Sequence, residues 1–373
     1  MKLRCSAQDL MIGLVNATRA LSVRPSSPVL EYVKVNAADD CVVLTCTDGS
    51  LTIRAEVKAE VEEEGDILLP GRLLTEIVRK LPEGVVTLSA NEKNITVIKC
   101  QQSRSTLTGM PAEEFPVMRD IINTHALHVP QKRLKEMISR VIFAIAQHES
   151  RQTLTGSLME VTRDEIRLVG LDGFRLALQT MKGSFVLPED KTILKAIIPG
   201  HVMNEMSRIM GDEEGAMVTF HMDQGHLMAI IGNTTVLTTL LAGEYINYRQ
   251  ILPTEWKTRV TVKCKEFEEA IERASLIARE GKNNLVKIKA ENDMMQITSM
   301  SDLGDVFEEI SIHLEGEAIE IAFNARYIGD VVKNIDDECC MLSMSNSVSP
   351  CVLSPVDGDA YLYLVLPVRV SNN

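Results

Sequence analysis

The chain has 373 residues, of which 45% are hydrophobic and 24% are charged, and its net charge is −13. This length suits two or three domains, and the composition is that of a soluble globular protein. No apolar run approaches the ~20 residues needed to cross a bilayer, and the N-terminus lacks the apolar core of a signal peptide. We therefore expect a cytoplasmic protein without membrane contact.

Three long amphipathic helices are predicted, at residues 7–21, 130–146 and 265–278. Each spaces its apolar residues as a helix that buries one stripe does. A shorter helix follows each of them, at residues 70–81, 199–210 and 323–335. Alternating segments between the helices predict strands, for example at residues 42–46, 51–55, 166–169, 217–221, 227–231 and 319–323, and Asp-Gly pairs at 48–49, 172–173 and 357–358 predict turns.

The succession of helix, strands, helix and strands therefore occurs three times, at intervals of roughly 125 residues. A glutamate followed by an aromatic residue also recurs, at residues 114–115 and 244–245. We predict an α+β fold of three repeated domains, at residues 1–125, 126–253 and 254–373. Chance echoes within an ordinary α+β chain are the alternative.

The sequence predicts neither a metal site nor a cofactor. The eight cysteines are scattered without Cys-x-x-Cys spacing, and the histidines lack ligand spacing, so buried thiols are expected. Cys339 and Cys340 should occupy opposite faces of a strand, with a strained redox pair as the alternative. Motifs for phosphate loops, dinucleotide binding and hydrolases are absent. Asp172 and Arg175, near loop 148–151, could suggest an enzyme, but we interpret Asp172 as a turn residue and Arg175 as either a polar rim residue or a structural ion-pair residue.

Positive charge concentrates on the predicted helices of this acidic chain. Residues 130–147 carry four basic side chains against one acidic one, and residues 71–80 carry three against one. This segregation favours mild, sequence-independent contact with DNA phosphates, although an ordinary solvated helix surface is the alternative. Aromatic residues are only 4% of the chain, which argues against stacking on single strands and against base flipping.

Five segments resemble one known family. They are Arg-Pro-Ser-Ser-Pro-Val-Leu at residues 24–30, Leu-Asp-Gly-Phe-Arg-Leu-Ala at 171–177, Tyr-Arg-Gln-Ile-Leu-Pro at 248–253, Phe-Asn-Ala-Arg-Tyr at 323–327 and Val-Leu-Pro-Val-Arg at 365–369. In this order they resemble motifs of the bacterial sliding clamp, the beta subunit of DNA polymerase III. The resemblance implies a head-to-tail homodimeric ring, with helices lining the hole and antiparallel sheets outside, that encircles duplex DNA and performs no chemistry.

The resemblance also implies a pocket for short partner peptides, which have a Gln near their start and a Leu or Phe near their end. The implied partners are double-stranded DNA, the DNA polymerase III alpha subunit, the clamp loader, other DNA polymerases and repair proteins with clamp-binding motifs, and a second copy of the chain. The implied pocket residues are Leu154, Leu171, Gly173, Phe174, Arg175, Leu176, Ile246, Gln250, Ile251, Asn324, Tyr327, Val348, Pro350, Leu364, Leu366, Pro367 and Val368.

Two further residue sets follow. The DNA-facing candidates are Arg24, His148 and Arg151 from the resemblance, and Arg72, Lys132, Arg133 and Lys135 from the charge pattern. The implied subunit contact places Ile77, Arg104 and Leu107 of one chain against Leu276, Ile277, Asp305, Glu308 and Glu309 of the other.

The chain departs from the family pattern at several positions. Leu171 and Phe174 replace a Thr and a His, which makes the pocket mouth more apolar. Gln152 and Thr153 replace two tyrosines near the DNA, and Ser105 replaces a phenylalanine of the dimer contact. Residues 371–373 extend beyond the usual C-terminus. A monomeric scaffold that binds peptides without DNA remains the main alternative function.

Overall fold

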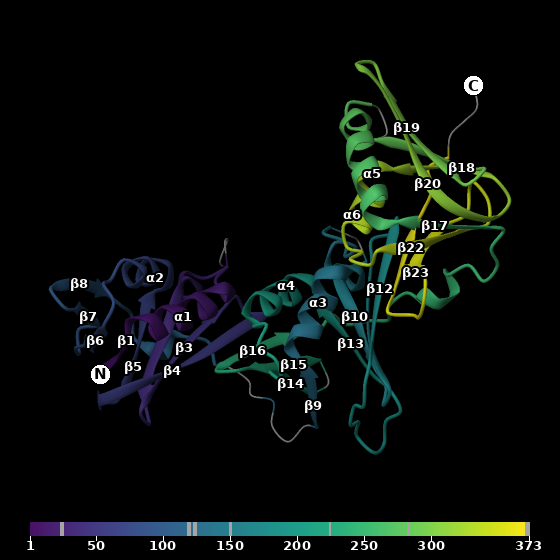
Figure 1. The fold of residues 1–373 in the computed structure, drawn as a ribbon. Coiled ribbons are helices and arrows are strands. Elements are labelled where there is room, and N and C mark those ends of the chain that lie inside the picture. The colour runs from purple at the N-terminus through teal and green to yellow at the C-terminus, as the bar shows by residue number, and fades with distance from the viewer. Residues whose placement is uncertain are drawn as a thin grey trace. The chain divides into compact units, whose positions relative to one another are not determined.

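The structure of the chain is a computed structural model that describes residues 1–22, 26–117, 121, 125–148, 151–223, 225–281 and 284–369. The chain forms two compact units, shown in Figure 1. The first unit comprises Met1–Lys135 and Glu205–Leu240, and the second comprises Glu136–Asn204 and Leu241–Asn373.

One succession of elements occurs three times: a strand, a helix, four strands, a second helix and three strands. The first repeat contains β1 (Lys2–Ser6), α1 (Ala7–Ala17), β2 (Tyr32–Ala38), β3 (Cys41–Thr47), β4 (Leu51–Glu63), β5 (Gly65–Pro70), α2 (Gly71–Arg79), β6 (Val85–Ala90), β7 (Ile95–Cys100) and β8 (Ser103–Thr108). The second contains β9 (Ala126–Pro130), α3 (Gln131–Ile142), β10 (Gly156–Val161), β11 (Glu165–Leu171), β12 (Arg175–Lys182), β13 (Leu194–Pro199), α4 (Gly200–Ile209), β14 (Met217–Met222), β15 (His226–Ile231) and β16 (Thr234–Thr239).

The third repeat contains β17 (Thr258–Lys263), α5 (Cys264–Ala278), β18 (Leu285–Glu291), β19 (Met294–Ser301), β20 (Gly304–Gly316), β21 (Ile319–Asn324), α6 (Ala325–Val332), β22 (Cys339–Met344), β23 (Cys351–Pro355) and β24 (Tyr361–Val365). Short 3-10 helices are η1 (Thr18–Ala20), η2 (Pro28–Glu31), η3 (Ala112–Glu114), η4 (Gln152–Thr155) and η5 (Tyr248–Gln250). The predicted α+β repeat is confirmed.

Local chemistry explains where several helices begin and end. The Ser6 hydroxyl accepts a hydrogen bond from the backbone N–H of Asp9 and caps α1, and Asn324 caps α6 in the same way. The prediction of one helix over residues 130–146 was too long. The α3 helix ends at Ile142, because the following backbone turns back and the N–H of Ala146 donates to the carbonyl of Leu154.

Each unit contains one antiparallel sheet of twelve strands. In the first unit the order is β8-β7-β6-β1-β4-β16-β15-β14-β9, with β2, β3 and β5 joined beside β4. In the second unit the order is β13-β10-β11-β12-β24-β23-β22-β17-β20-β19-β18-β21. Each sheet therefore contains strands of two different repeats.

The repeats are joined within each unit by the same strand pairing. In the first unit β4 pairs with β16, and Ile53 lies opposite Val236. In the second unit β12 pairs with β24, and Ala177 lies opposite Tyr363. All four are the third residues of their strands. We call the β4–β16 pairing the first junction and the β12–β24 pairing the second junction.

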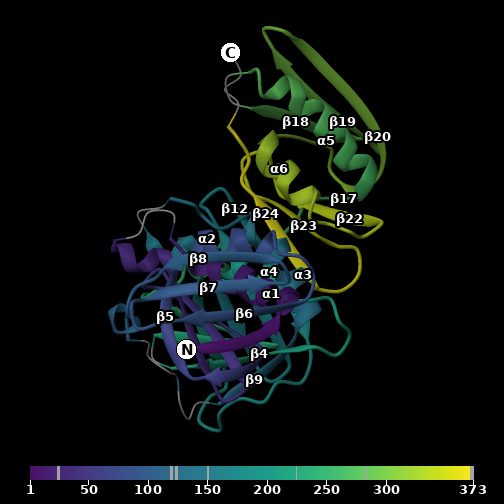
Figure 2. The same cartoon turned by 90° about the vertical axis from the view of Figure 1, so that its left-hand side faces the viewer.

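The helices pack against these sheets through close backbone approach and apolar contact. A Cβ atom added at Gly13 of α1 would lie 2.5 Å from a methyl group of Val57 in β4, so only glycine fits there. Figure 2 shows α5 running along β19 and β20 with α6 beside it. Among the described residues, no helix is long and apolar enough to cross a membrane.

The predicted thiol arrangement is confirmed for the cysteine pair in β22. Cys340 is buried and Cys339 is half-buried, as expected for alternating faces of a strand, and both are free thiols. Two other cysteines, Cys46 and Cys351, are buried, and burial raises the pKa of their thiols. Both thiols therefore stay protonated at neutral pH.

Candidate functional site

The loop before β12 is a tight turn that separates two neighbouring side chains. The Asp172 carboxylate accepts hydrogen bonds from the backbone N–H groups of Phe174 and Arg175, each at 3.0 Å, and Gly173 has a φ of +84°. The turn leaves Phe174 54% exposed and directs Arg175 inward, where it is 7% exposed. The interpretation of Asp172 as a turn residue is confirmed.

Arg175 connects the second repeat to the third. Its Nε donates to Asp172 Oδ2 at 2.9 Å, its Nη1 donates to Asp330 at 2.5 Å, and its Nη2 donates to the carbonyl of Phe143 at 2.6 Å. Its guanidinium also lies 4.9 Å from the ring centroid of Tyr327. Arg175 is therefore buried and paired with two carboxylates, as expected for a structural ion-pair residue.

A cavity of about 1140 Å³ lies beside this ion pair, within the second unit. Phe174 and Tyr327 line it, and their rings stack with centroids 5.3 Å apart. His148 and His201 line it as well. Three of the predicted pocket residues, Phe174, Arg175 and Tyr327, are therefore brought together here.

A second group of predicted pocket residues forms one apolar cluster. Leu154, Leu171, Leu176 and Leu364 are buried in it, and Ile246 and Leu366 pack against it. The C-terminal segment is fixed beside this cluster, because the N–H of Leu366 donates to the carbonyl of Phe174. Sequence reasoning missed other members of the cluster, which include Leu241, Tyr245, Tyr248, Leu252, Trp256 and Val352.

The remaining predicted pocket residues are placed separately. Gln250, Ile251 and Val348 are exposed, and Pro350 and Pro367 are half-buried. Asn324 is the cap of α6, and the N–H of Val368 donates to the carbonyl of Ala322. Gly173 occupies the turn described above. The assignment of the whole set to one peptide site remains a prediction.

The predicted DNA-facing residues differ in exposure. Arg24 lies outside the described residues. Lys132, Arg133 and Arg151 are exposed, as is His148, whereas Arg72 donates to the carbonyl of Ser22. Lys135 is paired with Asp212 at 2.9 Å, so its charge is partly neutralised within the chain. Charge counting along the helix could not reveal this partner, because Asp212 is far away in the sequence.

The predicted subunit-contact residues lie on α2 and β8 in the first unit, and on α5 and β20 in the second. Leu276 is 62% exposed, but Leu107 is only 6% exposed and offers little side-chain surface. Glu308 already accepts two hydrogen bonds from Arg273, at 2.8 Å each, and the pKa of Glu308 is lowered because of them. Sequence reasoning missed three exposed apolar residues on the same hairpin, Met300, Leu303 and Phe307. The sequence did hold a signal for one of them, because Phe307 is an apolar residue among the acidic residues of β20.

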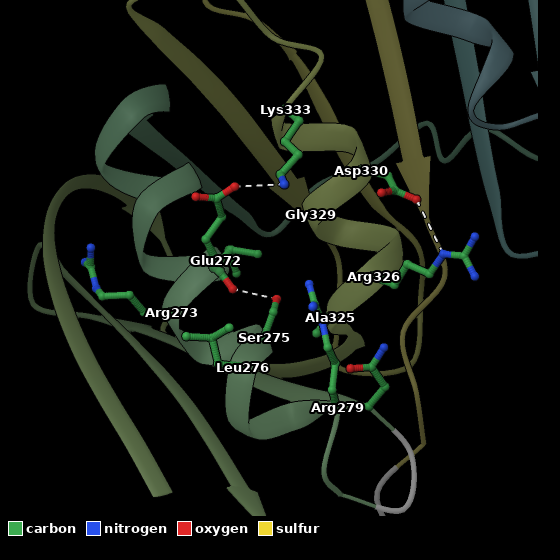
Figure 3. A pocket seen from close by; sticks show the side chains of 12 residues that line it. Glu272, Arg273, Ser275, Leu276, Arg279, Ala325, Arg326, Gly329, Asp330 and Lys333 are labelled. Carbon is green, nitrogen blue, oxygen red and sulfur yellow. Dashed lines mark hydrogen bonds and ion pairs between the residues drawn. The ribbon is translucent and has the colours of Figure 1, made fainter.

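Leu276 also lines a groove of about 700 Å³ between α5 and α6, shown in Figure 3. Lys333, the residue that follows α6, and Glu272 of α5 form an ion pair at 2.8 Å across it. Arg326 is held near Asp330 on α6, 3.9 Å from Nε to the carboxylate. Opposite charges are thus paired along the groove, and Leu276 is left as an exposed apolar side chain at its edge.

Comparison with known proteins gives a consistent result over almost the whole chain. Sequence profiles of the DNA polymerase III beta subunit match residues 1–119 (N-terminal domain), 128–247 (central domain) and 249–369 (C-terminal domain). The beta sliding clamp of Bacillus subtilis (strain 168) is 31% identical over 99% of this chain and 100% of that protein. That of Staphylococcus epidermidis is 30% identical over 97% of this chain and 98% of that protein.

Solved structures agree. The DNA polymerase sliding clamp from Bacillus subtilis has a TM-score of 0.94 at 31% identity, with all of both chains covered. A putative DNA polymerase III beta subunit from Eubacterium rectale has a TM-score of 0.94 at 29% identity, with 99% of each chain covered. The predicted boundaries near residues 125 and 253 remain a prediction, but three clamp domains and the absence of an enzyme activity are established by this kinship. The chain belongs to the DNA polymerase III beta subunit family, the bacterial beta sliding clamps.

Proposed function

We propose that two copies of this chain close head to tail into a ring that encircles duplex DNA, and that the ring tethers a DNA polymerase through a peptide bound at the second junction. A clamp catalyses no reaction. It acts by enclosing the DNA and by binding its protein partners. The observation that carries the proposal is the repetition of the junction in a chain of three repeats. Two junctions are formed within the chain, and among the described residues the strands that would form a third each keep one edge without a strand partner.

The strands for the third junction are β8 and the first half of β20. Within the described part of the chain, β8 pairs only with β7, and residues 304–311 pair only with β19. By position in the repeat, β8 corresponds to β16 and β24, and β20 corresponds to β4 and β12. An open strand edge is a template for pairing with another chain, and a closed ring removes it.

Repetition also gives the register of this third junction. Since third residues face each other at both existing junctions, Ser105 of β8 should face Val306 of the partner's β20. Arg104 then lies opposite Phe307 and diagonal to Asp305 and Glu309. Opposite charges and an aromatic residue at such cross-strand distances favour pairing by roughly 0.2–1 kcal/mol each.

The apolar surface supports the same arrangement. Leu276, Leu303 and Phe307 are all more than half exposed. Burying each such side chain contributes about 1.5–3 kcal/mol, which a second copy would supply. Phe307 also provides an aromatic side chain at this junction, opposite Arg104 and next to the pair formed by Val306 and Ser105. Ser105 is the position where the family commonly has phenylalanine.

The proposed DNA contacts are few. Lys132, Arg133 and Arg151 are exposed, with Arg24, Arg72 and His148 as further candidates and Lys135 weakened by its ion pair. Phosphate contacts confer affinity without sequence preference, and a small number of them gives weak binding that falls steeply with salt. Sliding then requires little energy, and the closed ring provides retention.

The proposed partner site is the half-buried edge of the apolar cluster at the second junction, where Ile246 and Leu366 lie, together with Phe174 and the exposed Gln250 and Ile251. An apolar surface with few orienting polar groups suits a short peptide. The occupants we propose are segments of the polymerase III alpha subunit, the clamp loader, and other polymerases and repair proteins. The chain would act in the cytoplasm.

Retention on DNA of different topology tests the ring. Loaded by its clamp loader on nicked circular DNA, the protein should stay bound in salt that releases ordinary electrostatic binders, and linearising the DNA should release it. Leu276→Asp should abolish retention and give a monomer by light scattering, since a carboxylate in a desolvated contact costs several kcal/mol. Val356→Asp, at an exposed apolar residue in the turn before β24, is the matched control. Equal retention on circular and linear DNA, or a stable monomer, would instead favour the scaffold alternative.

A further inference from the structure

The segment that follows β16 is held down at several points within the second unit. We call residues 245–251 the strap. The hydroxyl of Tyr245 donates to the carbonyl of Val169 at 3.2 Å, and Tyr248 is only 2% exposed. Just before the strap, the N–H of Leu241 donates to the carbonyl of Ile197 in β13. The strap therefore lies against β10 and β11.

A buried carboxylate forms the strongest of these attachments. Glu160 of β10 is 2% exposed, and its register places it between Arg167 of β11 and Lys195 of β13. The hydroxyl of Tyr248 donates to Oε2 at 2.9 Å, and Arg249 donates to the same oxygen at 2.6 Å. Lys195 approaches Oε1 at 3.0 Å. Two consecutive strap residues are thus bound by one carboxylate.

This attachment fixes what the strap presents to solvent. Tyr248 and Arg249 begin the 3-10 turn η5, in which the N–H of Ile251 donates to the carbonyl of Tyr248 at 3.0 Å. Gln250 and Ile251 follow directly and are exposed, while Ile246 packs on the apolar cluster. Because the turn is short, displacing Tyr248 or Arg249 would move Gln250 and Ile251 with them.

The first repeat shows that the fold does not need a carboxylate here. The fifth residue of β2, equivalent to Glu160 in β10, is Asn36, which is half-buried. The corresponding segment after β8 is held by a backbone bridge between Leu68 and Met110 and by Phe115 in a small apolar cluster. A buried ion pair seldom adds stability beyond that of apolar packing, but it fixes geometry.

We propose that Glu160 is a positioning residue for partner binding: its carboxylate holds Tyr248 and Arg249 so that Gln250 and Ile251 are preorganised to contact the partner peptide. This rests on the proposed peptide site at the second junction. A preorganised segment loses less conformational entropy when a ligand binds, so releasing it lowers affinity without removing any contacting side chain. Glu160 itself touches no peptide.

The test compares full-length variants in calorimetric titration with a synthetic peptide that has Gln near its start and Leu and Phe near its end. Glu160→Gln removes the charge at constant shape and should weaken binding about tenfold, while the dimer mass stays unchanged. Tyr248→Phe, a milder change, should weaken binding about threefold. Hydrogen exchange of the strap amides should quicken in both variants. Glu291→Gln, which removes the partner of Lys289 in β18 of the same sheet, is the matched control and should bind as the unaltered chain does.

The outcomes are distinguishable. Unchanged affinity in Glu160→Gln, with faster exchange in the strap, would show that Glu160 is merely structural and would overturn the inference while leaving the peptide site intact. An equal loss in Glu291→Gln would also overturn it, since the effect would then be general to the sheet. Absence of peptide binding by the unaltered chain would overturn the proposed site and the inference together.

Discussion

The first and second junctions share a backbone plan but differ in side chains. At both, an aspartate before the joining strand, Asp48 or Asp172, accepts hydrogen bonds from two following backbone N–H groups. The next non-glycine residue is Ser50 at the first junction and Phe174 at the second. Strand pairing joins two repeats at both junctions. The first has cavities of about 310 and 390 Å³, whereas the second has a larger one of about 1140 Å³ with an exposed aromatic ring, Phe174, at its lining.

The ion pairs of the two junctions show the same divergence. The acidic partner is the sixth residue of a short helix in both cases, Glu205 of α4 and Asp330 of α6. At the first junction Arg19, after α1, binds Glu205 at 3.0 Å. At the second junction the residue in the position of Arg19, after α3, is Phe143, which carries no charge. Arg175 of β12 supplies the guanidinium instead. The acidic residue at this position of the short helix is therefore paired by an arginine that comes from a different element in each junction.

Replacing the arginine of each ion pair should give the largest difference in stability between the two junctions. Arg175→Ala leaves Asp172 and Asp330 without their shared buried partner, so we expect a loss of about 3 kcal/mol in the free energy of unfolding. Arg19→Ala should cost about 1 kcal/mol, because Glu205 keeps Arg208 as a partner. Urea unfolding followed by circular dichroism measures both. Equal losses would mean that the two junctions are energetically alike.

Acid should weaken the attachment of the strap next to the second junction. Burial alone would raise the pKa of Glu160, but hydrogen bonds from Arg249, Lys195 and Tyr248 lower it to about 2. A depressed pKa contributes stability above the unfolded value near 4.3, and this contribution is lost as pH falls toward about 2.

We expect this contribution to be about 1–2 kcal/mol, since Arg249 and Lys195 are half exposed and screened by water. Thermal unfolding measured between about pH 5 and pH 2 checks it, with Glu160→Gln as the control that should show a shallower pH dependence. An unchanged dependence in that variant would assign acid sensitivity to other carboxylates.

Exchanging the residues after the turns should have the smallest effect on stability. Phe174→Ser gives the second junction the residue of the first, and we expect a change within about 0.5 kcal/mol in unfolding because the ring is half exposed. Peptide affinity should fall about tenfold, as the loss of about 1.4 kcal/mol of apolar contact predicts. Ser50→Phe should create no peptide binding. Binding by that variant would show that the turn residue alone defines the site.

Sequence reasoning was most successful where structure is decided locally. The helix starts, the Asp-Gly turns and the threefold repeat follow from apolar periodicity, capping and turn chemistry, all of which act over a few residues. The motif at residues 171–177 also indicated the family, because its turn and buried arginine are recognisable as a short string. Even there, the end of α3 was misplaced, since a contact with Leu154 terminates it.

Only the tertiary structure decided which distant groups meet. Nothing near Arg175 in the sequence indicates Asp330, nothing near Lys135 indicates Asp212, and nothing near Glu160 indicates Tyr248 and Arg249. The same holds for the register of β4 with β16 and of β12 with β24. Periodicity states which face of an element is buried, but the partner on that face depends on the packing of the whole chain, since the energy of such a contact depends on geometry that local sequence does not determine.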